Sequence, residues 1–160
     1  MLATSGTERR ISTCRTPTRS DWGEIDPRDL DAQWALEQFL GKSLADAEVL
    51  FATNALYYGE ALEAMPPVPF NFYARALAHY LTSDKARGDA DGASSFLRIF
   101  AWILEKRPEI IDPETKAKLM SAAEQVANNQ DFYEASASIY KRFPEQLNRI
   151  RRLSRRPPRR

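Results

Sequence analysis

Apolar residues recur at helical spacing along most of the chain. The clearest stripe lies over about 70–81, at positions i, i+3, i+4, i+7 and i+11, as on one face of an α-helix. A second stripe, over about 93–107, belongs to the most apolar predicted helix, so we expect that helix at the centre of the fold. Sustained apolar–polar alternation is missing, so no strand is predicted.

Residues that begin or end helices separate the stripes in the first half of the chain. Gly41 follows a stripe at about 29–40, as a helix stop would. Ser43 and Asp46 have the spacing of a capping box and open the next predicted helix. Asn54 breaks that helix, and the helical pattern then continues to Met65.

Proline and polar segments divide the second half in the same way. The Pro66–Pro69 segment predicts an interruption before 70–81. The polar stretch 82–92 predicts the one long loop, with Asp91 or Ser94 capping the helix after it. Further helices are expected from Pro113 to the Asn128–Asn129 pair, over about 131–142, and from Pro144 through Leu153. Six or seven such helices predict an all-α fold, as an antiparallel bundle or a short solenoid-like array.

Charge is distributed unevenly, although the formal total is only +1. Residues 1–20 carry four Arg against one Glu, and residues 21–148 carry 12 Lys and Arg against 21 Asp and Glu. Residues 149–160 carry seven Arg and no acid. The pattern predicts a disordered basic leader (1–20), an acidic all-α domain (21–148) and an Arg-rich tail (149–160) that continues from the last helix.

The leader and the single cysteine indicate a reducing compartment. Cys14 is the only cysteine, so no intramolecular disulfide and no cysteine-based zinc site is possible. The leader lacks the apolar stretch of a secretory signal. Its Ser, Thr and Arg content is typical of an organelle transit peptide, but without an apolar face we favour a disordered leader or an over-long gene start. We therefore expect a cytoplasmic protein with no membrane-spanning helix.

Residues capable of catalysis are few. His79 is the only histidine, and its place away from the main stripe predicts an exposed or rim residue rather than a base or metal ligand. Glu60 and Glu63, at i and i+3 beside Tyr57, predict a solvated acidic face more than a metal site. No nucleotide-binding glycine motif is present. We expect no cofactor, no metal and no catalytic residue, with an enzyme based on carboxylates alone as a remaining alternative.

Aromatic residues gather on either side of the Pro66–Pro69 segment and predict a hairpin with a ring-lined interior. The group is Tyr57, Tyr58, Phe70, Phe72, Tyr73 and Tyr80. Phe72 and Trp102 lie off the main stripes of their helices, so each must bury against a second surface or stay exposed. An exposed ring there would serve as an anchor for a partner.

The Arg-rich tail has two interpretations. It is a candidate polyanion-binding arm, through Arg149, Arg151, Arg152, Arg155, Arg156, Arg159 and Arg160. Alternatively, it is a solubilising tail that partly folds back on its own acidic body. The acidic body opposes the first interpretation, because it repels the same polyanion.

Three segments carry a resemblance to known sequences. They are FLGKSLADAEVLF at 39–51, NALYY at 54–58 and FNFY at 70–73, with Glu60 and Met65 between them. Together they resemble small helical bacterial proteins of uncharacterised role, over about residues 34–105. The resemblance implies an all-α domain and supplies no catalytic residue.

These observations predict a non-enzymatic helical protein that binds another macromolecule. We expect its acidic face, with Phe72, Trp102, Glu60 and Glu63, to engage a basic protein partner, in the manner of small acidic immunity or adaptor proteins. A nucleic-acid-associated protein that uses the Arg-rich tail is the first alternative. An enzyme that uses carboxylates is the second. The oligomeric state is left open.

Overall fold

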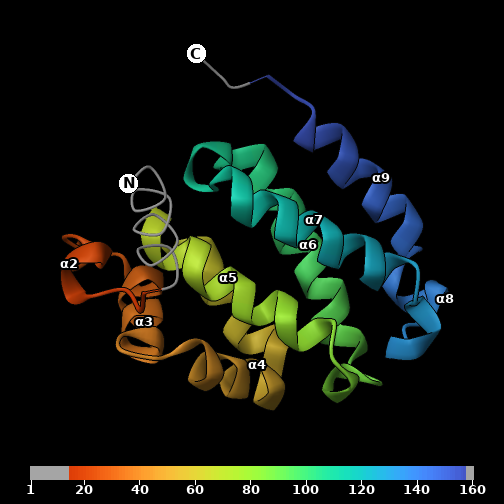
Figure 1. The fold of residues 1–160 in the computed structure, drawn as a ribbon, viewed down its shortest axis with the longest axis horizontal. Helices are drawn as coiled ribbons and strands as arrows, with labels where there is room; N and C mark the ends of the chain where they lie inside the picture. The colour runs from red at the N-terminus through yellow and green to blue at the C-terminus, as the bar shows by residue number, and fades with distance from the viewer. Residues whose placement is uncertain (1–14, 158–160) are drawn as a thin grey trace, which may run out of the picture.

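A computed structural model of the protein describes residues 15–157, and every regular element in that range is helical. The predicted all-α fold is therefore confirmed (Figure 1). The α-helices are α2 (Arg19–Trp22), α3 (Leu30–Phe39), α4 (Leu44–Gly59), α5 (Pro67–Leu81), α6 (Ala90–Lys106), α7 (Pro113–Ala127), α8 (Ala137–Tyr140) and α9 (Phe143–Ser154). Short 3-10 turns lie between them: η1 (Glu60–Ala64), η2 (Asp84–Ala86), η3 (Pro108–Ile110) and η4 (Gln130–Tyr133).

Five helices close a ring around one core. α4 packs against α5, α5 against α7, α7 against α9, α9 against α6, and α6 against α4. In Figure 1, α2 to α4 lie at one end and α9 at the opposite end, with α5 and α7 between them. α6 also contacts α5 and α7, so the expected central position of this helix is confirmed. A closed ring is a bundle rather than a solenoid, in which each unit contacts only its neighbours.

Most predicted helix ends are confirmed because they depend on local chemistry. The Ser43 and Asp46 capping box is present at the start of α4, and Asp112 caps α7 with Pro113 at its first position. Asn54 leaves the helical region (φ −163°, ψ 87°), and its Oδ1 accepts a hydrogen bond from the Tyr57 amide at 3.0 Å. Asn54 thus ends one helical segment of α4 and caps the next.

Two predicted boundaries are wrong, both by a few residues. α5 begins at Pro67 rather than Phe70, because the first amides of a helix need no partner and proline fits there. The 82–92 segment is not a long loop, since it contains η2 and α6 begins at Ala90. The N-cap of α6 is Asp89, whose Oδ1 accepts from the Gly92 amide at 2.9 Å, and neither Asp91 nor Ser94 fills that position.

The predicted helix over 131–142 is absent. The chain instead forms η4, a left-handed residue at Glu134 (φ 56°) and the single turn of α8. The Gln130 side-chain amide explains the difference, because it donates to the carbonyls of Ala135 and Lys141, both at 2.8 Å, and its oxygen accepts from the Phe143 amide at 3.0 Å. The segment therefore folds around one half-buried side-chain amide instead of forming a continuous set of helical hydrogen bonds.

The basic ends of the chain are partly built into the body. Arg19 begins α2, and the Trp22 ring is buried, 6.4 Å from the ring of Tyr73. At the other end, α9 buries Phe143, Leu147, Ile150 and Leu153. Arg149, Arg151 and Arg152 therefore lie on a helix whose apolar face belongs to the core. The rest of the predicted leader, with Cys14, and Arg159 and Arg160 lie outside the described residues.

Candidate functional site

A hollow of about 520 Å³ lies where the start of α3, the end of α4 with η1, and α6 come together. It is referred to below as the acidic groove. It is lined by Asp29, Asp31, Trp34, Tyr57, Glu60, Glu63, Ala64 and Trp102. Four of these residues are carboxylates, three are aromatic and none is a cation, so the chemistry of this surface suits a positively charged ligand.

Local contacts position the carboxylates of the acidic groove. Asp29 is the N-cap of α3 and accepts from the Ala32 amide at 3.0 Å. Glu63 accepts from Arg98 at 2.8 Å. Arg107 donates to the carbonyl oxygens of Glu63 and Met65, at 2.8 and 3.0 Å, which fixes the backbone at the end of η1. Within residues 15–157, Asp31 and Glu60 form no ion pair, so both carboxylates are available.

The aromatic rings of the acidic groove support one another. The Trp34 ring meets the Tyr57 ring edge to face, with centroids 5.0 Å apart, and stacks on the Tyr58 ring at 6.4 Å. Trp102 is half-buried and packs against the core, whereas Tyr57 is exposed. Exposed aromatic faces beside carboxylates bind guanidinium and ammonium groups through cation–π attraction combined with ion pairing.

The structure brings together three of the four residues predicted to bind a protein partner. Trp102, Glu60 and Glu63 all line the acidic groove. Phe72 does not, because its side chain is only 4% exposed and packs edge to face on Tyr73 within the bundle. Phe72 was predicted either to bury against a second surface or to stay exposed, and the structure shows that it is buried.

Sequence reasoning missed the part of the groove that comes from α3. Asp29 and Asp31 stand at a helix start, where acids are expected as caps and first-turn residues, and nothing in that pattern points to a groove. Trp34 was assigned to the apolar stripe of its helix. Only the packing of α3 against η1 places these residues opposite Glu60 and Glu63.

A second hollow, of about 470 Å³, lies between α6, α8 and α9 and has the opposite charge. It is referred to below as the arginine groove. Its lining contains one acid, Glu145, and five cations: Arg98, Lys141, Arg142, Arg149 and Arg152. Tyr140 also lines it and donates to Asp91 at 2.8 Å, a hydrogen bond that raises the pKa of the phenol, so this group stays neutral.

The arginines predicted to bind polyanions are divided by the fold. Arg149 and Arg152 line the arginine groove, and Arg149 is paired with Glu105 at 3.0 Å. Arg151 points elsewhere and meets Glu124 at 3.6 Å. Arg155 and Arg156 follow the end of α9 and are exposed. The pairs with Glu105 and Glu124 show that the basic helix does fold back on the acidic body, as the second interpretation of the tail expected.

His79 occupies the exposed position that its place in the sequence predicted. Its side chain is 75% exposed, and its Nδ1 lies 2.9 Å from the Glu48 carboxylate.

Among residues 15–157, no three potential metal ligands come together, and no helix there is long and apolar enough to cross a membrane. Comparison with protein-family models, with curated proteins and with solved structures gives no match. The proposal of a function therefore depends on the chemistry of the acidic groove and of the arginine groove.

Proposed function

We propose that the protein is a non-enzymatic, cytoplasmic binding protein whose acidic groove holds a cationic segment of a protein partner. The observation that carries this proposal is the meeting of four carboxylates and three aromatic rings in one hollow of about 520 Å³. A cavity of this size holds one or two Arg or Lys side chains, and the aromatic faces would cover their aliphatic stems while the carboxylates meet their charged ends.

The charge of the body supports a protein partner that is basic. Residues 21–148 have nine more acids than bases. A field of this sign accelerates encounter with a cationic protein and disfavours polyanions at the same surface. An enzyme based on carboxylates would use Glu60 and Glu63. The Glu63 carboxylate accepts a hydrogen bond from Arg98, so of the two only the Glu60 carboxylate is free of a cation within residues 15–157. No contact in the groove favours turnover over binding.

A peptide of alternating Arg and Gly tests the acidic groove, with the fluorescence of the tryptophans and calorimetry as readouts. Replacing Asp31 and Glu60 together (Asp31→Asn with Glu60→Gln) should weaken binding about tenfold or more, because each replacement removes a charge-assisted contact. The matched control removes two charges elsewhere, by Glu37→Gln with Glu109→Gln, at two exposed acids that do not line the groove. Equal weakening by the control and the groove variants would show that the peptide responds only to net charge, and would refute the proposal.

The arginine groove supports a second candidate function, polyanion binding. Its five cations face a single acid, and Lys141, Arg142 and Arg152 form no ion pair within the described residues. Replacing Lys141 and Arg142 with Gln should weaken binding of a DNA duplex and lower the magnitude of its salt slope by about 2. Lys85→Gln, an exposed cation on η2, is the control. An unchanged salt slope in the double variant would exclude this groove as the DNA site.

A further inference from the structure

A third hollow, of about 500 Å³, lies on α5 between α4 and α7, and neither proposed function uses it. It is referred to below as the α5 groove. Its apolar lining comes from Leu44, Phe72, Ala76, Ala78 and Ala122. Two cations, Arg75 and Lys118, share the groove with His79 and a single acid, Glu48.

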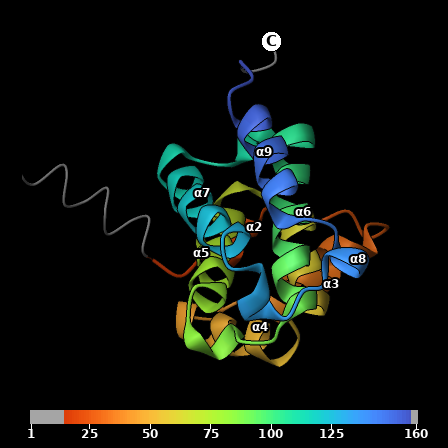
Figure 2. The same cartoon turned by 90° about the vertical axis from the view of Figure 1, so that its right-hand side faces the viewer.

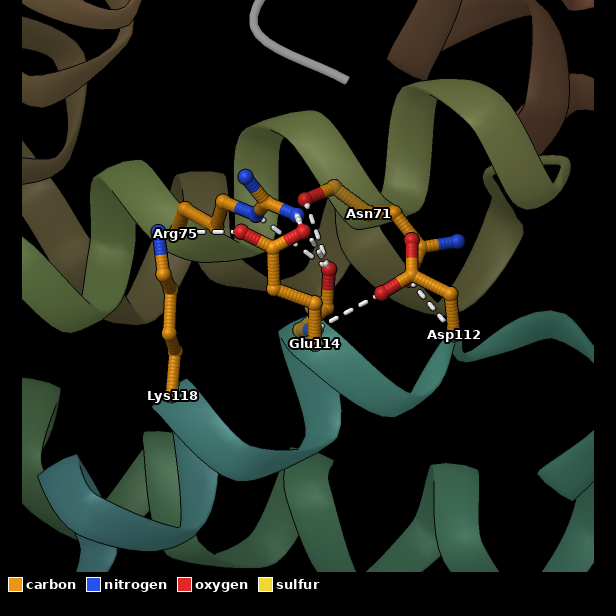
Figure 3. Close-up of polar contacts among 6 residues, drawn as sticks. Asn71, Arg75, Asp112, Glu114 and Lys118 are labelled. Carbon is orange, nitrogen blue, oxygen red and sulfur yellow. Dashed lines mark hydrogen bonds and ion pairs between the residues drawn. The ribbon is translucent and has the colours of Figure 1, made fainter. Parts of the chain in front are cut away.

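Arg75 is an unusual component of this lining because its charge is largely buried. Its side chain is only 10% exposed. Its Nε and Nη2 donate to Thr115 Oγ1 at 3.2 and 3.1 Å, which holds the guanidinium plane in place. Within residues 15–157, no acceptor meets Nη1, and Figure 3 shows one terminal nitrogen of Arg75 turned away from Glu114. A largely buried guanidinium with one nitrogen free of protein acceptors favours an anionic ligand, because an anion offsets part of the cost of removing the charge from water.

Within residues 15–157, Glu114 is the only acid that pairs with Arg75, and it compensates the guanidinium charge only weakly. Glu114 lies between Arg75 and Lys118, at 3.9 and 3.7 Å from their nitrogen atoms, and is 55% exposed (Figure 3). Both separations exceed hydrogen-bond distance, so one solvated carboxylate is shared between two cations. A ligand carboxylate could reach the same two cations with direct hydrogen bonds.

His79 adds a third polar group on the α4 side of the groove. Its Nδ1 is held by Glu48, whose own side chain is largely buried at 19% exposure. This contact orients the ring and leaves Nε2 available at the rim of the groove. The acid in the lining is therefore engaged by His79 and does not neutralise Arg75 or Lys118.

We propose that the α5 groove binds a small organic anion with an apolar body. Its carboxylate meets Nη1 of Arg75 and Nζ of Lys118, and its apolar part lies on Phe72, Ala76 and Ala122. A volume of about 500 Å³ is within the range of small-molecule sites, which combine an apolar lining with a few placed polar groups. The site differs from the acidic groove in the sign of its charge, and from the arginine groove in having two cations rather than five and in the burial of one of them, Arg75.

Octanoate is the probe that tests the α5 groove, by NMR titration of the backbone amides of the full chain. Octan-1-ol supplies the apolar body without the charge, and acetate supplies the charge without the apolar body. Octanoate should shift amides of the first turn of α4, of α5 and of α7, and bind at least about tenfold more tightly than either control. Replacing Lys118 with Gln should weaken octanoate about fivefold and leave octan-1-ol unchanged.

Two further variants separate binding from folding. Ala45→Trp fills the exposed rim on α4 and should abolish octanoate binding without disturbing the core. Arg75→Lys keeps the charge but loses the planar fork, and should weaken octanoate while the unfolding transition reports any change in stability. Equal affinity for octanoate and octan-1-ol, shifts confined to other helices, or an unaltered affinity in the Lys118→Gln protein would each overturn the proposal.

Discussion

The acidic groove and the arginine groove lie on either side of α6, and they differ in charge and in construction. Trp102 of α6 lines the first, while Leu97 and Ala101 of the same helix line the second. Arg98 lines the arginine groove, yet its guanidinium meets Glu63 of the acidic groove at 2.8 Å. One ion pair therefore joins the two surfaces, and the near-zero net charge of the chain conceals two surfaces of opposite charge.

The two grooves are also supported differently. The arginine groove is built on α9, which lies alongside α6 and contributes four buried apolar side chains to the core (Figure 2). The acidic groove depends on α3, whose C-terminal end is held by Tyr73. The Tyr73 hydroxyl lies 2.7 Å from the Phe39 carbonyl and 2.8 Å from the Lys42 carbonyl. The arginine groove thus depends on the global stability of the fold, whereas the acidic groove depends on the local hydrogen bonds of Tyr73.

Truncation of α9 should produce the largest effect. A chain that ends at Asn148 loses Ile150 and Leu153 from the core, and we expect the free energy of unfolding to fall by more than about 4 kcal/mol. A chain that ends at Ser154 keeps all four buried side chains of α9 and should change by less than about 0.5 kcal/mol. Urea denaturation followed by circular dichroism measures both. Similar stability in the two truncated chains would show that α9 is an appended arm.

Alkaline pH should weaken the fold at two buried tyrosines. Burial raises the pKa of Tyr73 to about 12 and that of Tyr133 to about 12. The unfolded chain releases these protons near pH 10, so the stabilisation is complete below pH 10 and is lost as the pH rises toward 12. The expected slope is about 1.4 kcal/mol per pH unit for each tyrosine. A stability profile that is flat between pH 10 and 12 would contradict this expectation.

Tyr73→Phe should show whether the hydrogen bonds that hold the end of α3 affect the acidic groove separately from the overall stability. We expect a loss of about 1–3 kcal/mol, because the Phe39 and Lys42 carbonyls lose the one hydroxyl donor that they share, together with weaker binding of the Arg and Gly peptide. Tyr133→Phe is the matched control, since its hydroxyl donates to the Leu81 carbonyl, and neither residue lines the acidic groove. Denaturation and peptide titration of both variants give the comparison. Equal peptide affinity in the two variants would show that the hydrogen bonds of Tyr73 do not shape the groove.

Arg98→Gln should have the smallest effect and the most specific one. Glu63 loses its cation, so peptide binding at the acidic groove should strengthen roughly two- to fivefold. The arginine groove loses one charge, so the magnitude of the salt slope for a DNA duplex should fall by about 0.9. Parallel titrations with the peptide and the duplex measure both changes. An unchanged peptide affinity and an unchanged salt slope would mean that neither groove depends on this pair.

The sequence predicted the elements that local chemistry determines. The capping box of Ser43 and Asp46, the helix start at Pro113 and the break at Asn54 depend on residues within four positions of one another. The segment 131–142 was mispredicted because Gln130 reaches carbonyls up to 11 positions away. A helical wheel places Phe72 off the main stripe, but α5 is covered by both α4 and α7, so a second face of the helix is buried.

The candidate grooves were predictable only in part. Glu60, Glu63 and Trp102 stood out by spacing and by their place off the stripe, and the structure gathers them. Their meeting with Asp31 and Trp34 depends on the packing of α3 against η1, which no local pattern encodes. Arg75 resembles an ordinary cation in the sequence, and only the burial of its side chain distinguishes it.

Because α4 is interrupted at Asn54, a residue outside the acidic groove controls the orientation of side chains that line it. Tyr57 and Glu60 follow the break, so their direction is set by the angle between the two segments, and that angle depends on one amide side chain outside the groove. A lineage that varied position 54 would redirect its ligand preference while leaving every lining residue unchanged.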